Sequence, residues 1–271
     1  MNNELLYEVS NGIAVITINR PERRNALSRA VREGFFEVWR RFEADAEAQV
    51  AILTGAGDNF CAGMDLKEFF HELKGKPDEY DRILRMAVEW RGRTLRQFPK
   101  PTIAMVNGHC FGGAFSIVEG CDLAVAADEA QFGLSEINFR MFPGGGVSKA
   151  LANLMRPRDA LLYAMTGRRF DGKKAAEIGF VNQSVPRARL EAETMALARE
   201  LAGKDPVALR ACKDAYRVSL EMPWDAAVSY AVAKEHEVFV LQKGAWVEQG
   251  IGDFVKGLYK PGLEGHGDAK A

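Results

Sequence analysis

Residues 101–115 read PTIAMVNGHCFGGAF, and this stretch decides the fold. Its first part, Thr102 to Val106, has the composition of a short buried strand and runs into the turn pair Asn107-Gly108. A helix is predicted over 113–119, directly after Gly112. A strand that passes through glycines into a helix is a repeating unit of α/β domains.

The same order of strand and helix is found on both sides of this stretch. The predicted strands lie at 5–9, 13–18, 50–53, 121–126, 131–133 and 181–185. The predicted helices lie at 28–46, with Ser28 as the cap, and at 78–97, 146–154, 157–165 and 172–178. These repeated units indicate an α/β fold with mainly parallel strands.

No strand is predicted after Pro186. Helices follow at 187–203, 206–218, 223–241 and 244–258. We therefore divide the chain into an α/β core at 1–203 and a helical region at 204–271.

The composition is that of a folded protein without a strong electrostatic field. Of the 271 residues, 47% are hydrophobic and 27% are charged, which argues against disorder and allows one large domain with a modest appendage. The formal net charge is −1, so no long-range field favours nucleic acid or a membrane surface. We expect neither as a partner.

The cysteines and histidines indicate no metal site. Cys61, Cys110, Cys121 and Cys212 form no CxxC pair, and the four histidines show no ligand spacing. The sequence begins without a secretory signal, and no stretch approaches the roughly 18 apolar residues that span a bilayer. We therefore expect a reduced, cytoplasmic protein.

A second glycine-bearing segment, FCAGMDLK at 60–67, has the same character as the one at 107–115. Small residues allow the backbone to approach a ligand, and the first N–H groups of a helix have no intrahelical partner. Two such segments that converge on one carbonyl would form an oxyanion hole. From spacing alone, however, Gly-Gly between a strand and a helix is more often a tight turn.

Glu136 is the candidate acid. It lies in QFGLSEI at 131–137, just before the run PGGG at 143–146. A carboxyl in a glycine-lined, apolar setting can have a raised pKa and transfer protons. The alternative is a solvated loop glutamate.

The segments at 60–68, 101–146 and 166–186 resemble the crotonase superfamily of enoyl-CoA hydratases and isomerases. Asn19-Arg20-Pro21 and Asn25-Ala26-Leu27 match it too, so the likeness covers nearly the whole chain. The resemblance implies a crotonase-like spiral of ββα units at 1–203, holding CoA and the active site, and a helical trimerisation region at 204–271. It also implies an acyl-CoA thioester substrate and a homotrimer or a dimer of trimers.

In this family two backbone amides hold the thioester oxygen. The matching positions are Met64, after the Ala-Gly pair, and Gly113 in the second glycine segment. Gly144 matches the glycine whose backbone helps to place the reacting water. CoA is expected along the backbone of Ala26, Ala62, Met64 and Leu66. CoA enters as part of the substrate, so the resemblance implies no other cofactor and no metal.

The catalytic acids distinguish this chain within the family. Ordinary hydratases carry one glutamate at the position of Ser116 and another at the position of Glu136, and here only the second is an acid. The surrounding residues most resemble hydroxycinnamoyl-CoA hydratase-lyases. That resemblance implies that a feruloyl-, coumaroyl- or caffeoyl-type thioester is hydrated and then cleaved to an aromatic aldehyde and acetyl-CoA.

The expected acyl pocket departs from those lyases. Phe69 and Val232 stand where the lyases have tyrosines that grip the phenol, which favours a less polar acyl chain. His109 stands where they have tryptophan, and Phe142 is a further candidate for the pocket wall. Phe69 and Phe142 can line the pocket or only pack in the fold, and His109 can be a proton carrier in the pocket or a structural histidine.

Two charged residues near the site also differ from what the resemblance leads us to expect. Glu119, one helical turn after Ser116, can partly replace the missing glutamate or face away from the pocket. Arg140 replaces a glycine in the loop after Glu136 and can simply be solvated.

Three functions therefore remain open. The first is a hydroxycinnamoyl-CoA hydratase-lyase that uses Glu136. The second is an enoyl-CoA hydratase or double-bond isomerase for another, less polar acyl-CoA. The third is a non-catalytic CoA-binding or scaffold protein, and the retained Glu136 argues against it.

Overall fold

The computed structural model describes residues 3–258, apart from the side chains of residues 87 and 91–93. The chain divides into two compact units, Met1–Arg199 and Glu200–Ala271. Within the described residues, no helix is both long enough and apolar enough to cross a membrane.

A six-stranded sheet forms the centre of the first unit. Its order is β1 (Leu5–Ser10), β2 (Ile13–Ile18), β3 (Val50–Gly55), β5 (Thr102–Val106), β7 (Leu123–Ala127) and β10 (Gln183–Val185). β1 and β2 form the predicted antiparallel hairpin, and every later pair is parallel. The prediction of an α/β fold with mainly parallel strands is confirmed.

A second sheet of four short strands was not predicted. Its order is β4 (Asn59–Cys61), β6 (His109–Phe111), β8 (Gln131–Gly133) and β9 (Arg169–Asp171). The chain alternates between the sheets, because β3 is followed by β4, β5 by β6 and β7 by β8. A helical segment follows each of these pairs, which gives the spiral of ββα units.

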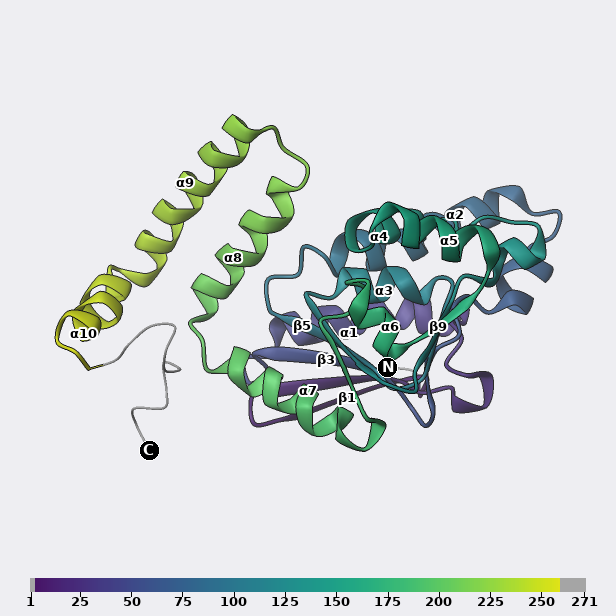
Figure 1. Ribbon diagram of the computed structural model, residues 1–271, viewed down its shortest axis with the longest axis horizontal. Coiled ribbons are helices and arrows are strands. Elements are labelled where there is room, and N and C mark those ends of the chain that lie inside the picture. Colours follow the sequence, from purple (N-terminus) through teal and green to yellow (C-terminus); the bar gives the residue numbers. More distant parts are fainter. Residues whose placement is uncertain (1–2, 259–271) are drawn as a thin grey trace. The chain divides into compact units, whose positions relative to one another are not determined.

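Helices cover the two sheets. They are α1 (Arg29–Ala44), α2 (Pro77–Val88), α3 (Ala114–Gly120), α4 (Val147–Leu154), α5 (Pro157–Thr166), α6 (Gly172–Glu177) and α7 (Arg187–Ala202). In Figure 1, α2, α4 and α5 lie together on one side of this unit, above the long strands. α1 begins as predicted, because the Ser28 side chain accepts a hydrogen bond from the backbone N–H of Val31 at 3.0 Å.

The helix predicted over 78–97 is interrupted. The α-helix ends at Val88, and a π-helix, η3 (Glu89–Thr94), continues it. The wider turn carries Trp90, which is fully buried and stacks on Phe35 of α1 with ring centroids 4.0 Å apart. A tertiary contact thus accompanies the change of helix type.

The second unit is helical. It contains α8 (Pro206–Ser219), α9 (Trp224–Gln242), the π-helix η5 (Trp246–Ile251) and α10 (Gly252–Val255). Asp205 caps α8 through the backbone N–H of Ala208, and Lys234 of α9 forms an ion pair with Asp214 of α8 at 3.1 Å. The predicted helix at 244–258 is instead divided between η5 and α10.

Candidate active site

The first predicted oxyanion donor, Met64, lies at the end of a short β-bridge with Leu27. The Leu27 N–H donates to the Gly63 carbonyl at 2.8 Å, and the Asp65 N–H donates to the Leu27 carbonyl at 3.3 Å. In a parallel bridge, the residue that lies between the two bonded partners, here Met64 between Gly63 and Asp65, points its own N–H and C=O away from the opposite strand. The Met64 amide therefore faces away from Leu27.

The second predicted donor, Gly113, lies against the same turn. A Cβ built on Gly63 would be 3.3 Å from the Gly113 nitrogen and 2.7 Å from the Phe111 carbonyl oxygen. Gly63 has φ +86°, a conformation that favours glycine, so its identity permits both the turn and the close approach. The backbones that carry the two predicted donors are thus in direct contact.

Glu136 lies beside these glycines on the 3₁₀-helix η4 (Ser135–Phe139). A Cβ on Gly112 would be 2.7 Å from Glu136 Oε1, so the carboxyl lies directly over this turn. Its other oxygen, Oε2, is buried and has no hydrogen-bond partner among the described residues. Burial raises the pKa of Glu136, and a hydrogen bond from its own backbone amide opposes the rise only in part. A buried, unpaired carboxyl oxygen beside an oxyanion site is suited to proton transfer.

Ser116 and Glu119 have different surroundings, although both lie on α3. The Ser116 hydroxyl donates to the Gly113 carbonyl at 2.9 Å, and a Cβ on Gly146 would lie 3.2 Å from the Ser116 Cβ. Buried Glu119 instead forms an ion pair with Arg96 and accepts a hydrogen bond from Asn153 at 2.8 Å. Glu119 therefore connects α3 to α4 and to the segment just after η3, and its contacts do not support a role as the second glutamate.

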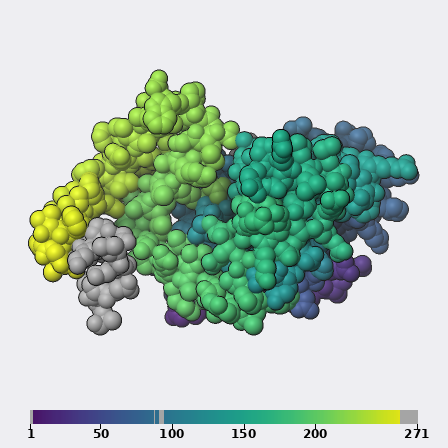
Figure 2. All heavy atoms as spheres, in the orientation of Figure 1, coloured from purple at the N-terminus to yellow at the C-terminus, as the bar shows by residue number. Residues whose placement is uncertain are grey.

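The glycine run at 144–146 closes another side of the site. Ser148 holds it by donating to the Pro143 carbonyl at 2.6 Å. A Cβ on Gly144 would lie 3.8 Å from the Phe142 ring, and the Phe142 side chain is exposed. In the space-filling view, the surface around α4 and α5, next to this run in the sequence, faces the viewer (Figure 2). Phe142 is thus placed near the predicted water-binding glycine.

The backbone expected to hold CoA consists of two hydrogen-bonded segments. The Ala62 N–H donates to the Arg24 carbonyl at 3.0 Å, and the Leu27–Met64 bridge continues this pairing. Ala26 lies on the first segment, and Leu66, which is exposed, lies just beyond the second. The four predicted CoA positions therefore border one pair of adjacent backbones.

Sequence reasoning assigned no role to Arg20, which joins these two segments. Its guanidinium donates to the Ala26 carbonyl at 2.7 Å and to Asp65 at 3.3 Å, and it lies within ion-pair distance of Glu4 and Glu68. Asn19-Arg20-Pro21 matched the family, and that match was the available signal. Arg20 acts on the site by positioning its backbone.

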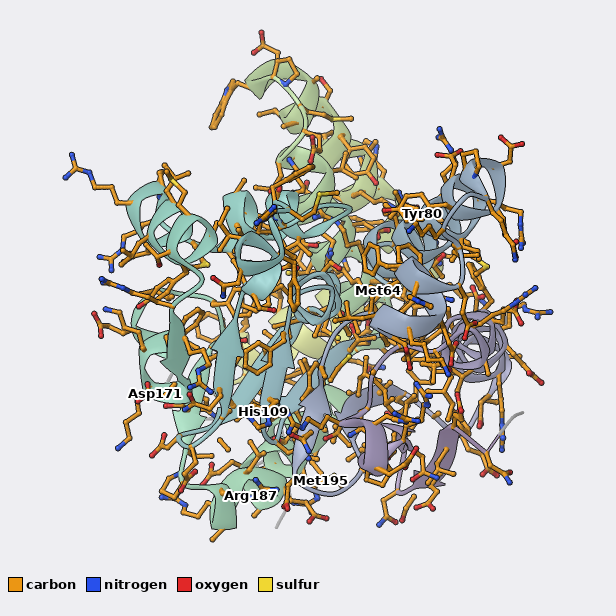
Figure 3. The ribbon with its side chains drawn as sticks, turned by 90° about the vertical axis from the view of Figure 1, so that its right-hand side faces the viewer. Met64, Tyr80, His109, Asp171, Arg187 and Met195 are labelled. Atoms are coloured by element: carbon orange, nitrogen blue, oxygen red, sulfur yellow. The ribbon has the colours of Figure 1, made fainter. Side chains whose placement is uncertain are left out.

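Phe69 is part of an apolar cluster around the π-helix η2 (Lys67–His71). Phe69, Leu73 and Ile83 are buried there, and Met64, Tyr80 and Leu84 pack against them. Phe69 thus lies in the same cluster as the side chain of a predicted oxyanion residue. Figure 3 shows Tyr80 and Met64 near one another in this part of the molecule.

The structure does not place His109 in this cluster. His109 lies on β6, where it contacts Asn59 and the Phe111 ring, and Figure 3 shows it near the end that carries Arg187. Burial lowers the pKa of His109, and the charges of Arg24 and Arg169 lower it further. Val232 lies on α9 of the second unit and is half-exposed. Roles for both residues in the acyl pocket stay predictions.

Arg140, the remaining departure, ends η4. It has φ +61°, and its backbone N–H bonds to the Ile137 carbonyl at 3.1 Å. The side chain is exposed, which agrees with the solvated alternative. Its backbone conformation explains why a glycine is suited to this position.

Comparisons with known proteins agree on one family. The family model for enoyl-CoA hydratase/isomerase matches residues 8–256. A hydroxycinnamoyl-CoA hydratase-lyase from Pseudomonas fluorescens is 46% identical over 261 residues, which cover 96% of this chain and 95% of that protein. A mevalonyl-coenzyme A hydratase from Aspergillus fumigatus is 31% identical, and the matched region covers 90% of this chain and 88% of that protein.

Solved structures show the same fold. An enoyl-CoA hydratase from Bacillus anthracis superposes with a TM-score of 0.85 at 28% identity, covering 94% of this chain and 97% of its own. One from Mycobacterium smegmatis superposes with a TM-score of 0.87 at 26% identity, with the same coverage of both chains. The predicted crotonase-like architecture is therefore confirmed, while the trimerisation role of the helical region stays a prediction.

Proposed function

The chain belongs to the enoyl-CoA hydratase/isomerase family, and on that premise we propose that it hydrates a hydroxycinnamoyl-CoA thioester and cleaves the product to an aromatic aldehyde and acetyl-CoA. The observation that carries this proposal is the carboxyl of Glu136 beside Gly112, whose Oε2 is buried without a partner among the described residues, together with Ser116 at the second catalytic position. The likeness to the Pseudomonas hydratase-lyase supports the same conclusion.

In the proposed mechanism, the amides of Met64 and Gly113 donate to the thioester oxygen. Each donor stabilises the developing enolate by about 3 kcal/mol. Because these groups belong to the backbone and their segments are in contact, their positions are fixed before the substrate binds. CoA itself lies along Ala26, Ala62, Met64 and Leu66.

Glu136 exchanges protons in both steps. Its carboxylate first takes a proton from the water that attacks the carbon next to the ring, and then delivers that proton to the carbon next to the thioester. For cleavage, it removes the proton of the new hydroxyl as the bond between these two carbons breaks. The aldehyde leaves, and the enolate of acetyl-CoA takes the proton back. The raised pKa suits a group that must both accept and donate at neutral pH.

In this mechanism the backbone of Gly144 helps to bind the water. The glycine loop that contains Gly144 contacts Ser116 of α3, because a Cβ on Gly146 would lie 3.2 Å from the Ser116 Cβ. Ser116 in turn donates a hydrogen bond to the Gly113 carbonyl, so the loop lies beside the segment that carries a proposed oxyanion donor. We assign Gly144 the water-positioning role on this basis.

We further propose that the helical region at 204–271 mediates assembly into a trimer or a pair of trimers. The support is its exposed apolar surface, since Trp224 is 81% exposed and Val240 is 76% exposed. Burial of such side chains in a protein interface is favourable. Sedimentation of the pure protein tests this proposal, and a monomer at micromolar concentration would contradict it.

The function is tested by incubating pure protein with feruloyl-CoA. Loss of the conjugated thioester absorbance together with release of vanillin and acetyl-CoA is the expected result. The Glu136→Gln variant, which keeps the size of the side chain, is the control and should release both products about 10²–10⁴-fold more slowly. Its undiminished activity would contradict the proposed mechanism.

One observation favours a second candidate, hydration or isomerisation of a less polar acyl-CoA. Phe69 is buried among apolar side chains and offers no hydrogen bond to a phenol. Turnover of crotonyl-CoA or of a 3-enoyl-CoA without turnover of feruloyl-CoA would select this function. Inactivity of the wild-type protein on every thioester would select the non-catalytic alternative.

A further inference from the structure

One face of α2 runs from the oxyanion turn to the glycine loop. Tyr80, Leu84 and Val88 are four residues apart in turn, so they share a face of the helix. Tyr80 and Leu84 pack against the cluster of Phe69, which Met64 also contacts. At the other end, Val88 Cγ2 would lie 3.5 Å from a Cβ on Gly145. This face therefore borders both predicted halves of the active site.

The length of this face matches an extended aromatic acyl chain. With a rise of 1.5 Å per residue, the distance along the helix from Tyr80 to Val88 is ~12 Å. The side chain of Met64, whose amide is a proposed oxyanion donor, packs on the same cluster as Tyr80 and Leu84, so this face borders one side of the proposed site. Of these three side chains only Tyr80 carries a hydroxyl, since Leu84 and Val88 are aliphatic.

The Tyr80 ring is held in place while its hydroxyl stays available. Its centroid is 5.2 Å from that of Phe69 and 6.2 Å from that of Phe70, and its side chain is only partly exposed. No residue that the structure describes forms a hydrogen bond with the Tyr80 hydroxyl, whereas the Tyr7 hydroxyl donates to Asp45 at 2.9 Å. A fixed ring with an available hydroxyl is suited to recognising a polar group on a ligand.

Phe69 cannot supply such a group. Its ring is 1% exposed, and the guanidinium of Arg32 lies 5.1 Å from its centroid. Tyr80 packs against the same cluster and is more accessible. Beside this cluster, the accessible hydroxyl is therefore that of Tyr80 on α2.

We propose that Tyr80 is a specificity-determining residue whose hydroxyl binds the ring hydroxyl of the aromatic acyl group. This inference rests on the proposed function, and it adds the residue that selects a phenolic substrate. Tyr80 donates a hydrogen bond to the ring oxygen and so holds the ring in place while the electrons of the breaking bond move to the thioester. Loss of a hydrogen bond that leaves a polar group without a partner changes a rate by about 10-fold to 100-fold.

The test compares 4-hydroxycinnamoyl-CoA with cinnamoyl-CoA, which lacks only the ring hydroxyl. Cinnamoyl-CoA is measured as a substrate and as a competitive inhibitor, so that its binding can be read in either case. The Tyr80→Phe variant should lose about 10-fold to 100-fold in kcat/KM for the phenolic thioester. It should leave the inhibition constant of cinnamoyl-CoA unchanged. Tyr216→Phe, which removes the hydroxyl of an exposed tyrosine on α8, is the matched control.

A second variant separates recognition from packing. Tyr80→Leu removes the ring together with the hydroxyl, so it should weaken binding of both thioesters, whereas Tyr80→Phe keeps the ring that packs on Phe69 and should weaken binding of the phenolic thioester alone. Equal losses on both thioesters in Tyr80→Phe, or no loss on either, would overturn the inference while the proposed function stands. Inactivity of the wild-type protein on phenolic thioesters would overturn the proposed function and the inference together.

Discussion

The turn at Gly63 gives a sharp test of the oxyanion site. Gly63→Ala adds one methyl group at a position with φ +86°, where a residue with a Cβ is strained by about 1–2 kcal/mol. The methyl carbon would also lie 2.7 Å from the Phe111 carbonyl oxygen. Ordinary van der Waals contact begins at 3.4 Å, so the added methyl carbon and the Phe111 oxygen must move apart by about 0.7 Å.

This shift falls between the two predicted donors. A displacement of about 1 Å in a positioned group can cost 10²-fold in rate, and loss of one oxyanion donor costs about 10²–10³-fold in kcat. We therefore expect Gly63→Ala to lower kcat on its best aryl thioester by about 100-fold, or ~2.7 kcal/mol. CoA affinity should fall by a smaller factor, because only Ala62 and Met64 of the proposed CoA positions flank Gly63, whereas Ala26 and Leu66 lie further away.

Gly75→Ala is the matched control. Gly75 has φ +80°, so the same substitution causes similar backbone strain, but a Cβ there would meet no atom within 4 Å. Both variants should lose about 1–2 kcal/mol of unfolding free energy through this strain, and Gly63→Ala should lose more through the contact. Urea unfolding and steady-state kinetics of the three proteins give both quantities. If Gly63→Ala kept wild-type kcat, the two glycine turns could not form the oxyanion site.

Further predictions concern the two buried glutamates. Glu136→Gln should lower kcat by about 10²–10⁴-fold while CoA binding is retained, as measured by steady-state kinetics and calorimetry. Because burial raises the pKa of Glu136 in the folded state, kcat/KM should rise with pH through a limb that lies above the ordinary value of 4.5, and a limb at or below 4.5 would contradict this. The folded state keeps the proton of Glu136 to a higher pH than the unfolded state does. The protonated carboxyl therefore contributes fully to the free energy of unfolding below pH 4.5, and this contribution is lost as the pH rises through the folded pKa. In urea unfolding, Glu136→Gln should accordingly lose less stability between acid and neutral pH than the wild type does. Glu119→Ala leaves Arg96 and Asn153 unpaired and should cost about 3–5 kcal/mol in urea unfolding, and a loss under ~1 kcal/mol would contradict the buried ion pair.

The larger sheet was predictable because its main strands are long enough to show a pattern. β2, β3 and β5 have continuous apolar runs, and they pair in parallel as the strand-helix alternation indicates. The smaller sheet was missed because β4, β6 and β9 have only three residues each, too few for periodicity to appear. Their existence depends on pairing between segments distant in sequence.

The candidate site was predictable where its chemistry depends on residue type. The glycine segments and Glu136 stand out in the sequence, and the structure brings Gly63, Gly113 and Glu136 to one turn. Burial of the Glu136 carboxyl depends on tertiary packing and could not be read from its neighbours in sequence. The same holds for Tyr80, because the direction of the α2 face follows from its packing on Phe69.

The backbone and the side chain of Met64 are constrained in different ways. The backbone amide faces away from Leu27 because of the bridge beside Gly63, whereas the side chain packs against the cluster of Phe69. Any residue that keeps the turn supplies the same N–H, so a mutation of Met64 can change the side chain that packs against the Phe69 cluster without removing the backbone donor. The fold thus leaves substrate range open to evolutionary drift and holds the chemistry constant, which is a route by which one ancestral thioester enzyme can give rise to descendants with many different substrates.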